Sequence, residues 1–177
     1  MANRALVIGW DGADWDILDP LIAAGDMPAL QSLIERGRRG VSRSCMPSHS
    51  WAAWPTFLTG RDPGGHGVFD ILEYRPGASR RLPVSSRSIL APTWPDRFTS
   101  AGKTALVVNV PLTFPAPEIQ GVVIAGGPIP PGTTYSHPGD AGPRLNWPIN
   151  GGSWTTFRNK PVELVEVARS VIAEFEP

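Results

Sequence analysis

The sequence predicts an α/β fold with a mostly parallel sheet flanked by helices. Three apolar runs, at residues 5–9, 104–110 and 121–125, have the continuous hydrophobic character of strands that are buried on both faces. Segments with helix start and stop signals lie between and after these runs. Buried strands that alternate with such helices indicate parallel strands joined by crossover connections.

Three helices are expected from local signals. Residues 28–36 begin with a proline and are followed by a glycine, which is the usual asymmetry of helix ends. A second helix is expected to begin at Trp94, directly after Thr93, and to close at Gly102. In residues 162–175 the apolar side chains fall on one face at helical spacing: Leu164, Val165, Ala168, Val171, Ile172 and Phe175.

The organisation of the chain suggests one incomplete domain. A strand would ordinarily follow the last helix in this architecture, so we interpret residues 1–177 as the N-terminal part of a single larger domain. Residues 72–92 and 126–160 are rich in Pro, Gly, Ser and Arg, and are expected as surface loops outside the packed core. The loop-rich stretch 126–160 is alternatively the start of an inserted element.

Composition excludes several classes of protein. Sixteen basic and sixteen acidic residues give a formal net charge of zero, which argues against a nucleic-acid duplex or an acidic membrane as partner. The single cysteine excludes an internal disulfide and any site built from several cysteines. The first apolar run is too short for a signal sequence, and no run approaches the length of a membrane span. We therefore expect a soluble cytoplasmic protein.

Asp11 is the first candidate for a functional residue. In open α/β sheets, ligands bind outside the carboxyl ends of the strands, and Asp11 directly follows the first apolar run. Gly12 allows the backbone to turn sharply after it. The alternative is that Asp11 only caps a helix that starts near Asp14.

Ser50 is the second candidate, because it stands ahead of a short apolar helix. Backbone N–H groups and the helix dipole at such a position favour a bound anion such as phosphate. The alternative, that Ser50 is only a helix cap, stays open on spacing alone. His49 is adjacent, but neighbouring side chains diverge, and the chain has no Gly-x-Ser-x-Gly elbow.

Five motifs in order resemble the alkaline phosphatase superfamily, and within it the type I phosphodiesterases and nucleotide pyrophosphatases. They are Gly9-Trp10-Asp11-Gly12; Met27-Pro28-Ala29-Leu30 with Leu33 and Gly37; Pro47 and Ser50 leading to Thr59-Gly60; Pro63 with His66-Gly67-Val68-Phe69-Asp70; and Asn109-Val110-Pro111-Leu112-Thr113-Phe114-Pro115. The resemblance spans most of residues 5–138 and implies an alkaline phosphatase-like catalytic domain.

The resemblance implies a metal-dependent hydrolase of phosphate mono- or diesters, with a small-molecule phosphate ester as substrate. The family's nucleophile lies nine residues before the threonine of the Thr-Gly pair, which is Ser50, and the expected course passes through a phosphoseryl intermediate. Asp11 and Ser50 correspond to ligands of two divalent ions, usually zinc, with manganese as an alternative. The remaining Asp and His ligands of the family are missing, so we expect an N-terminal fragment with an incomplete metal site.

The chain departs from the family pattern at two positions near Ser50. Nucleotide pyrophosphatases carry an asparagine 21 residues after the nucleophile, and this chain has Ile71 there. Pro55 lies inside the expected helix, where proline removes a backbone donor unless it falls in the first turn. His66 stands in a glycine-rich turn, where we interpret it as a brace behind the helix of Ser50. His137 has no partner at metal-ligand spacing.

Three alternatives remain. Cys45-Met46-Pro47-Ser48 is superficially similar to a sulfatase motif, but Cys45 stands fourteen residues before Thr59 where nine are required, so we interpret it as an ordinary small residue. The chain is alternatively a non-catalytic or vestigial binding protein. It is also consistent with a phosphomutase of the same superfamily, which would move phosphate within one substrate.

Overall fold

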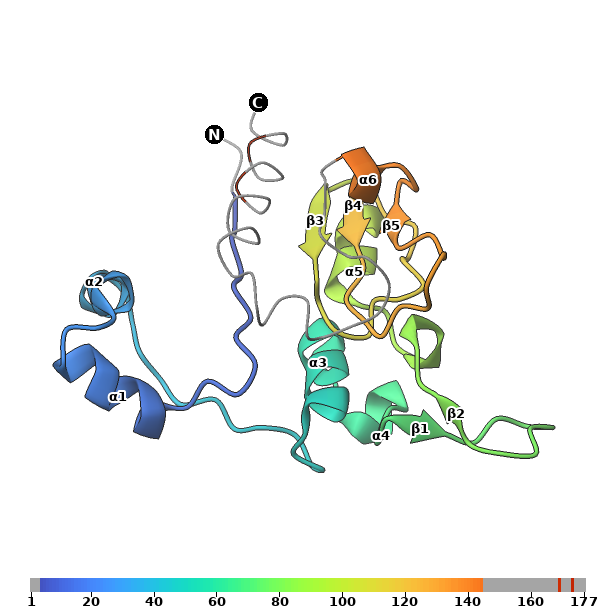
Figure 1. The fold of residues 1–177 in the computed structure, drawn as a ribbon, viewed down its shortest axis with the longest axis horizontal. Helices are drawn as coiled ribbons and strands as arrows, with labels where there is room; N and C mark the ends of the chain where they lie inside the picture. The colour runs from blue at the N-terminus through green and yellow to red at the C-terminus, as the bar shows by residue number, and fades with distance from the viewer. Residues whose placement is uncertain (1–3, 145–168, 170–172, 174–177) are drawn as a thin grey trace. The chain divides into compact units, whose positions relative to one another are not determined.

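The structure, a computed structural model, describes residues 4–144 together with the single positions 169 and 173 (Figure 1). The chain divides into two compact units, residues 1–44 and 45–177, and each unit is described by itself. The helix expected over residues 162–175 lies outside the described residues, except for Arg169 and Ala173, which are both helical.

The first unit contains two helices, α1 (Trp15–Ala23) and α2 (Pro28–Arg36). The bounds of α2 match the predicted segment, which confirms the proline and glycine signals. Arg39 joins the end of this unit to α1. Its guanidinium lies 3.9 Å from the centre of the Trp15 ring, and it pairs with the Asp19 carboxylate at 2.7 Å.

The strand predicted over residues 5–9 is absent from the described structure. These residues have no regular secondary structure, and Leu6 and Ile8 are 73% and 78% exposed. The prediction of a doubly buried strand is therefore wrong for this structure. A strand needs a neighbour that supplies hydrogen bonds and apolar cover, and residues 4–44 contain no other strand and bury only Leu18.

The second unit begins with two helices and a hairpin. Helix α3 (Ser50–Thr59) contacts the short helix α4 (Pro63–His66). A small antiparallel hairpin follows, formed by β1 (Leu72–Glu73) and β2 (Leu82–Pro83), and then a 3₁₀ turn, η1 (Ser86–Ser88). Helix α5 (Trp94–Ser100) has Thr93 as its N-cap, as the sequence predicted.

A three-stranded mixed sheet forms the rest of the second unit (Figure 1). Strand β3 (Ala105–Val108) pairs in parallel with β4 (Gly121–Ile124), which confirms two of the three predicted strands. Strand β5 (Ser136–His137) pairs antiparallel with β4. The chain is thus of the α/β type, and the mostly parallel sheet remains a prediction. Helix α5 packs on β3, whereas α6 (Ala141–Arg144) contacts β4 and β5.

Gly121 allows the close approach of the two parallel strands. Its φ is 136°, and a Cβ at this position would lie 1.9 Å from the Ala105 carbonyl oxygen. Any residue other than glycine would therefore force β3 and β4 apart.

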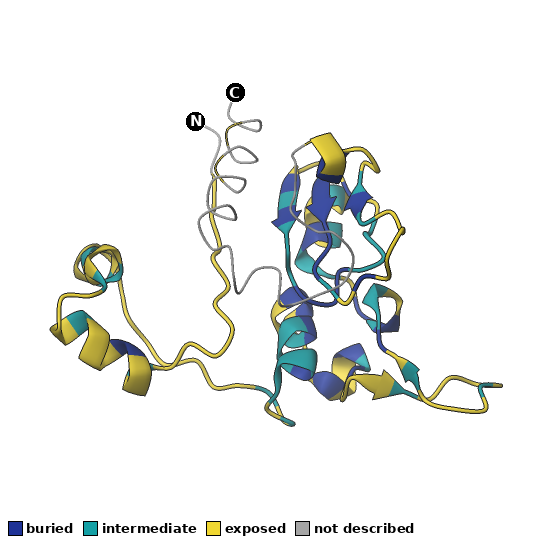
Figure 2. Ribbon diagram, viewed as in Figure 1, coloured by how far each residue is buried: buried dark blue, intermediate teal, exposed yellow. Residues whose placement is uncertain are grey.

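Buried residues are concentrated in the second unit, around the sheet and α3 (Figure 2). One cluster is formed by Ala105, Val107, Ile119 and Val123, with Trp94 packed against it. The expectation of surface loops is wrong at several positions. In residues 72–92 these include Val84, Ser88 and Ala91, and in residues 126–144 they include Ile129, Ser136 and Ala141, all of which are buried. These side chains fill the space beside α3 and the sheet, a tertiary effect that local composition does not reveal.

None of the helices in residues 4–144 is long and apolar enough to cross a bilayer.

Candidate active site

Ser50 is the first residue of α3. His49 has an extended backbone (φ −154°, ψ 160°) and takes the N-cap position, so the alternative that Ser50 is the cap residue is not supported. The helix ends at Thr59, and Gly60 adopts the left-handed conformation that closes it (φ 66°). The nine-residue spacing between Ser50 and Thr59 is therefore the length of one complete helix.

Buried packing fixes the start of α3. Trp51, the residue after Ser50, packs against a core cluster formed by Val68, Val84 and Leu112. Pro55 is the sixth residue of the helix, so it lies beyond the first turn, and its ring is fully buried. Proline therefore stands inside α3, where it removes one backbone N–H donor, and its buried ring packs against the rest of the second unit.

His66 braces α3 from behind, as the sequence indicated. Its side chain is fully buried, and its Nε2 lies 3.0 Å from the Thr56 hydroxyl on α3. The Val68 N–H donates to Nδ1 at 3.2 Å, so the hydrogen of the neutral ring is on Nε2 and donates to Thr56. The Thr56 hydroxyl in turn donates to the Ala52 carbonyl at 3.0 Å. Both ring nitrogens are satisfied only in the neutral form.

The electrostatics of His66 agree with this arrangement. Burial lowers the pKa of His66 below its ordinary value, and the charge of Asp62 opposes that shift only in part. A neutral imidazole at physiological pH is therefore the form that holds α3 in place.

His49 links the start of α3 to the segment that follows α4. Its Nε2 lies 2.9 Å from the Phe69 carbonyl oxygen, and because a carbonyl only accepts, Nε2 carries the hydrogen. Nδ1 is buried, and it has no hydrogen-bond partner among the described residues. The residue next to Ser50 is thus held by a contact across twenty positions of sequence.

The foot of the β1–β2 hairpin is a feature that sequence reasoning missed. Asp70 accepts hydrogen bonds from Arg81 at 2.6 Å and from the Ile71 N–H at 2.7 Å. The hydrogen bond from Arg81 holds the pKa of Asp70 below its ordinary value, with smaller contributions from Ile71 and from the nearby His49. Ile71, at the position of the family's asparagine, is exposed beside this ion pair. Of the Asp70–Arg81 pair, only Asp70 belongs to a motif that the sequence analysis identified, the one that runs from His66 to Asp70.

Asp11 lies in an exposed turn of the first unit. It does not cap α1, because Asp14 takes the N-cap position and its carboxylate accepts the Asp16 N–H at 2.9 Å. The capping alternative for Asp11 is therefore excluded. Asp11 belongs to the first unit and Ser50 to the second, and the role of both as metal ligands remains a prediction.

The described residues do not complete a metal site. Within residues 4–144 and positions 169 and 173, no three or more His, Cys, Asp or Glu side chains are grouped so that they could hold an ion. His66 is hydrogen-bonded to Thr56, and His137 lies in β5 outside any such group, so neither histidine completes the predicted set of metal ligands. The Cys45 thiol donates to the Pro47 carbonyl at 3.3 Å.

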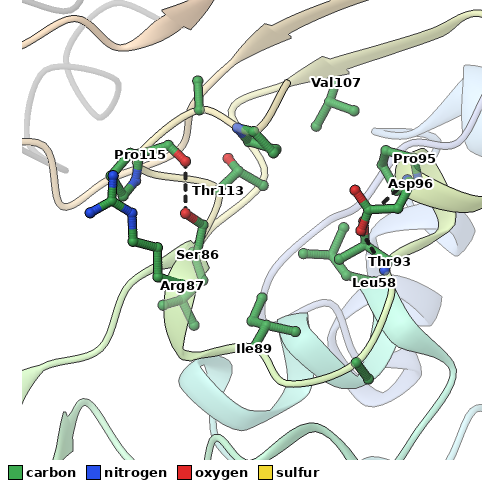
Figure 3. A pocket seen from close by; sticks show the side chains of 14 residues that line it. Leu58, Ser86, Arg87, Ile89, Thr93, Pro95, Asp96, Val107, Thr113 and Pro115 are labelled. Carbon is green, nitrogen blue, oxygen red and sulfur yellow. Dashed lines mark hydrogen bonds between the residues drawn. The ribbon is translucent and has the colours of Figure 1, made fainter. Parts of the chain in front are cut away.

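A pocket of about 260 Å³ opens at the other end of α3 (Figure 3). Its walls include Leu58, Ile89 and Leu112, and its polar edge includes Ser86 and Thr93. The polar groups of this edge are already engaged: Ser86 donates to the Pro115 carbonyl at 2.7 Å, and Thr93 donates to Asp96 at 2.6 Å. Leu58 follows Ser50 by eight residues, or about 12 Å of helix, so this pocket is separate from the nucleophile.

A comparison with known protein families settles what the chain resembles. The family profile described as type I phosphodiesterase / nucleotide pyrophosphatase matches residues 5–144, which include Asp11, Ser50 and the hairpin foot. The chain belongs to this family. Membership indicates a hydrolase of the phosphodiesterase or pyrophosphatase type that acts on small phosphate esters, in a family that is generally metal-dependent. No curated protein and no solved structure matches the chain.

Proposed function

We propose that this chain carries the nucleophile of a phosphate mono- or diester hydrolase, and that the nucleophile is Ser50. The observation that carries the proposal is the position of Ser50 at the first residue of α3, inside the segment that matches the family. A hydroxyl at this position meets the positive end of the helix dipole, which favours the negative charge of a phosphate group. The packing of Trp51 and the hydrogen bond between Thr56 and the buried His66 support the helix that presents it.

The proposed reaction has two displacements. The Ser50 oxygen forms a bond to phosphorus while the bond from phosphorus to the ester oxygen breaks, and the alcohol leaves with one proton. Water then attacks the phosphoserine, restores the serine hydroxyl and releases the phosphate. Two inversions give net retention at phosphorus, which distinguishes this course from direct attack by water.

Two divalent ions, zinc or alternatively manganese, are the proposed cofactors, with Asp11 and Ser50 among their ligands. Such ions would lower the pKa of the serine hydroxyl and reduce the repulsion of the substrate's charge. The described residues supply no complete cluster for them. Elemental analysis of the purified chain in excess zinc or manganese tests this part: bound metal that falls in Asp11→Ala supports it, and bound metal that stays unchanged in Asp11→Ala overturns it.

Ser50→Ala tests the nucleophile. We expect it to lower kcat/KM for a small phosphodiester by at least about a thousandfold, because the attacking atom is removed. Ser48→Ala is the matched control, since Ser48 precedes the same helix without being its first residue, and it should keep nearly full activity. Comparable activity in the two variants would overturn the proposal. Formation of an isomer of the substrate in place of an alcohol and phosphate would indicate a phosphomutase.

A further inference from the structure

The foot of the β1–β2 hairpin is tied to the residue that precedes Ser50. The His49 Nε2–H donates to the Phe69 carbonyl at 2.9 Å, and Asp70 is the next residue along the chain. His49 lies close enough to Asp70 for its charge to contribute to the lowered pKa of that carboxyl group. Phe69, Asp70 and the hairpin therefore lie beside the N-terminal end of α3, within one unit of the structure.

Arg81 is anchored at this foot by a single nitrogen. Its Nη2 donates to the Asp70 carboxylate at 2.6 Å and to the Leu72 carbonyl at 2.9 Å. The N–H groups on Nε and Nη1 have no acceptor among the described residues. The guanidinium is thus held in place by one nitrogen and keeps two others available to an anion.

An exposed aromatic ring lies beside this guanidinium. The Tyr74 ring centre lies 5.7 Å from the Arg81 Cζ atom, and Tyr74 is 80% exposed. Phe69 and Ile71 are also exposed at the foot. A fixed cation beside an exposed ring matches a ligand group that is both planar and negatively charged, because the anion would meet the guanidinium and the planar part would meet the Tyr74 ring.

We propose that Arg81 is a specificity-determining residue that binds a second anionic group on the substrate, beyond the phosphate that Ser50 attacks. The inference rests on the proposed function of Ser50 and names its substrate class: phosphate esters whose organic part carries a negative charge of its own. Asp70 is a positioning residue in this arrangement, since it holds Arg81 without contacting the substrate.

Two phosphonates that cannot be hydrolysed test the assignment. Binding of phenylphosphonate and of (4-carboxyphenyl)phosphonate to the full chain is measured by calorimetry, in the presence of zinc. The wild type should bind the carboxylated compound about tenfold more tightly, which is the effect of one charge-assisted pair of hydrogen bonds. Arg81→Gln should abolish this preference and leave the affinity for phenylphosphonate unchanged.

Arg80→Gln is the matched control, because Arg80 is the neighbouring exposed arginine and has no ion pair among the described residues. It should keep the tenfold preference. Arg81→Lys is the second variant: it keeps the charge that pairs with Asp70, but it loses the planar fork, so the preference should fall several-fold. An equal loss for both phosphonates in Arg81→Gln, or an unchanged preference in Arg81→Lys, would overturn the assignment.

The two proposals fail separately in these experiments. The phosphonates are not turned over, so the calorimetry reads Arg81 without any contribution from the chemistry of Ser50. A wild type with the tenfold preference but no hydrolysis would overturn the nucleophile and leave Arg81 as a binding residue. An active wild type without the preference would overturn Arg81 alone.

Discussion

The two units of the chain differ sharply in how they hold their candidate residue. In the second unit, Ser50 begins a helix that is fixed by the packing of Trp51 and by the hydrogen bond between Thr56 and the buried His66. In the first unit, Asp11 lies in an exposed turn after an apolar segment that forms no strand, and Leu18 is the one buried residue among positions 4–44. Ser50 is therefore positioned by a packed core, whereas Asp11 is positioned only by the local structure of its own segment.

This difference means that the described residues fix the position of Ser50 more firmly than the position of Asp11. The position of Ser50 depends on contacts between segments far apart in sequence, such as His49 with Phe69, so it is a property of the folded second unit. The first unit is stabilised by exposed interactions, among them Arg39 with Asp19 and Trp15. Exposed interactions contribute little free energy, whereas buried apolar area contributes much more.

The largest expected effect is a change in the core of the second unit. Ile124 in β4 is fully buried, so Ile124→Ala should lower the free energy of unfolding by about 2–5 kcal/mol through lost burial and the cavity left behind. Leu33→Ala is the control in the first unit, where Leu33 is 58% exposed, and it should change stability by less than about 0.5 kcal/mol. Urea denaturation followed by tryptophan fluorescence measures both, and similar losses would contradict the comparison.

The brace behind α3 should give the next largest effect. Thr56→Val removes the hydroxyl that accepts from the His66 Nε2–H, and it leaves a buried donor unpaired. We expect a loss of about 1–3 kcal/mol. Thr133→Val is the control, because the Thr133 hydroxyl only donates to a nearby carbonyl at an exposed site. If the two valine variants melt at the same temperature, His66 does not brace the helix.

The pH dependence of stability should report the same brace. The folded-state pKa of His66 lies below its unfolded value near 6.5, so the unfolded chain binds the proton first as the pH falls. The contribution of His66 is therefore present above about pH 6.5 and is lost from there down through the lowered folded pKa, with a slope of at most about 1.4 kcal/mol per pH unit. His66→Gln should remove this slope and His137→Gln should keep it. A slope of the opposite sign would contradict the assignment.

The smallest effect is expected in the first unit. Arg39→Ala removes the ion pair with Asp19 and the contact with the Trp15 ring, both at partly exposed positions. Amide hydrogen exchange of α1 should show a loss of protection of less than about 1 kcal/mol, and the ion-pair part should shrink further in high salt. A loss of several kcal/mol would mean that the first unit has a core of its own.

Local signals in the sequence predicted the elements whose causes are local. Helix α2 follows from Pro28 and the glycine after Arg36, and α5 follows from Thr93 as its cap. Strands β3 and β4 follow from apolar runs, and their burial agrees with that interpretation. The two-residue strands β1, β2 and β5 are too short to leave a periodic pattern, so they were not predicted.

Features that depend on contacts between distant segments could not be predicted from the sequence. Residues 5–9 have the composition of a buried strand, but a strand also needs a partner, and composition does not supply one. At the candidate site, the start of the Ser50 helix and the bracing role of His66 were predicted. The ties from His49 to Phe69 and from Arg81 to Asp70 were not, because each joins residues 11 to 20 positions apart through the folded backbone.

The most direct test of the central claim is to trap the covalent intermediate. The full chain is incubated with a small phosphodiester and zinc, quenched in acid, and digested for mass spectrometry of the peptide that contains both Ser48 and Ser50. The account predicts a phosphate on Ser50 that is absent without substrate and absent in Ser50→Ala. Turnover without any phosphate on Ser50, or with the phosphate on Ser48, would contradict it.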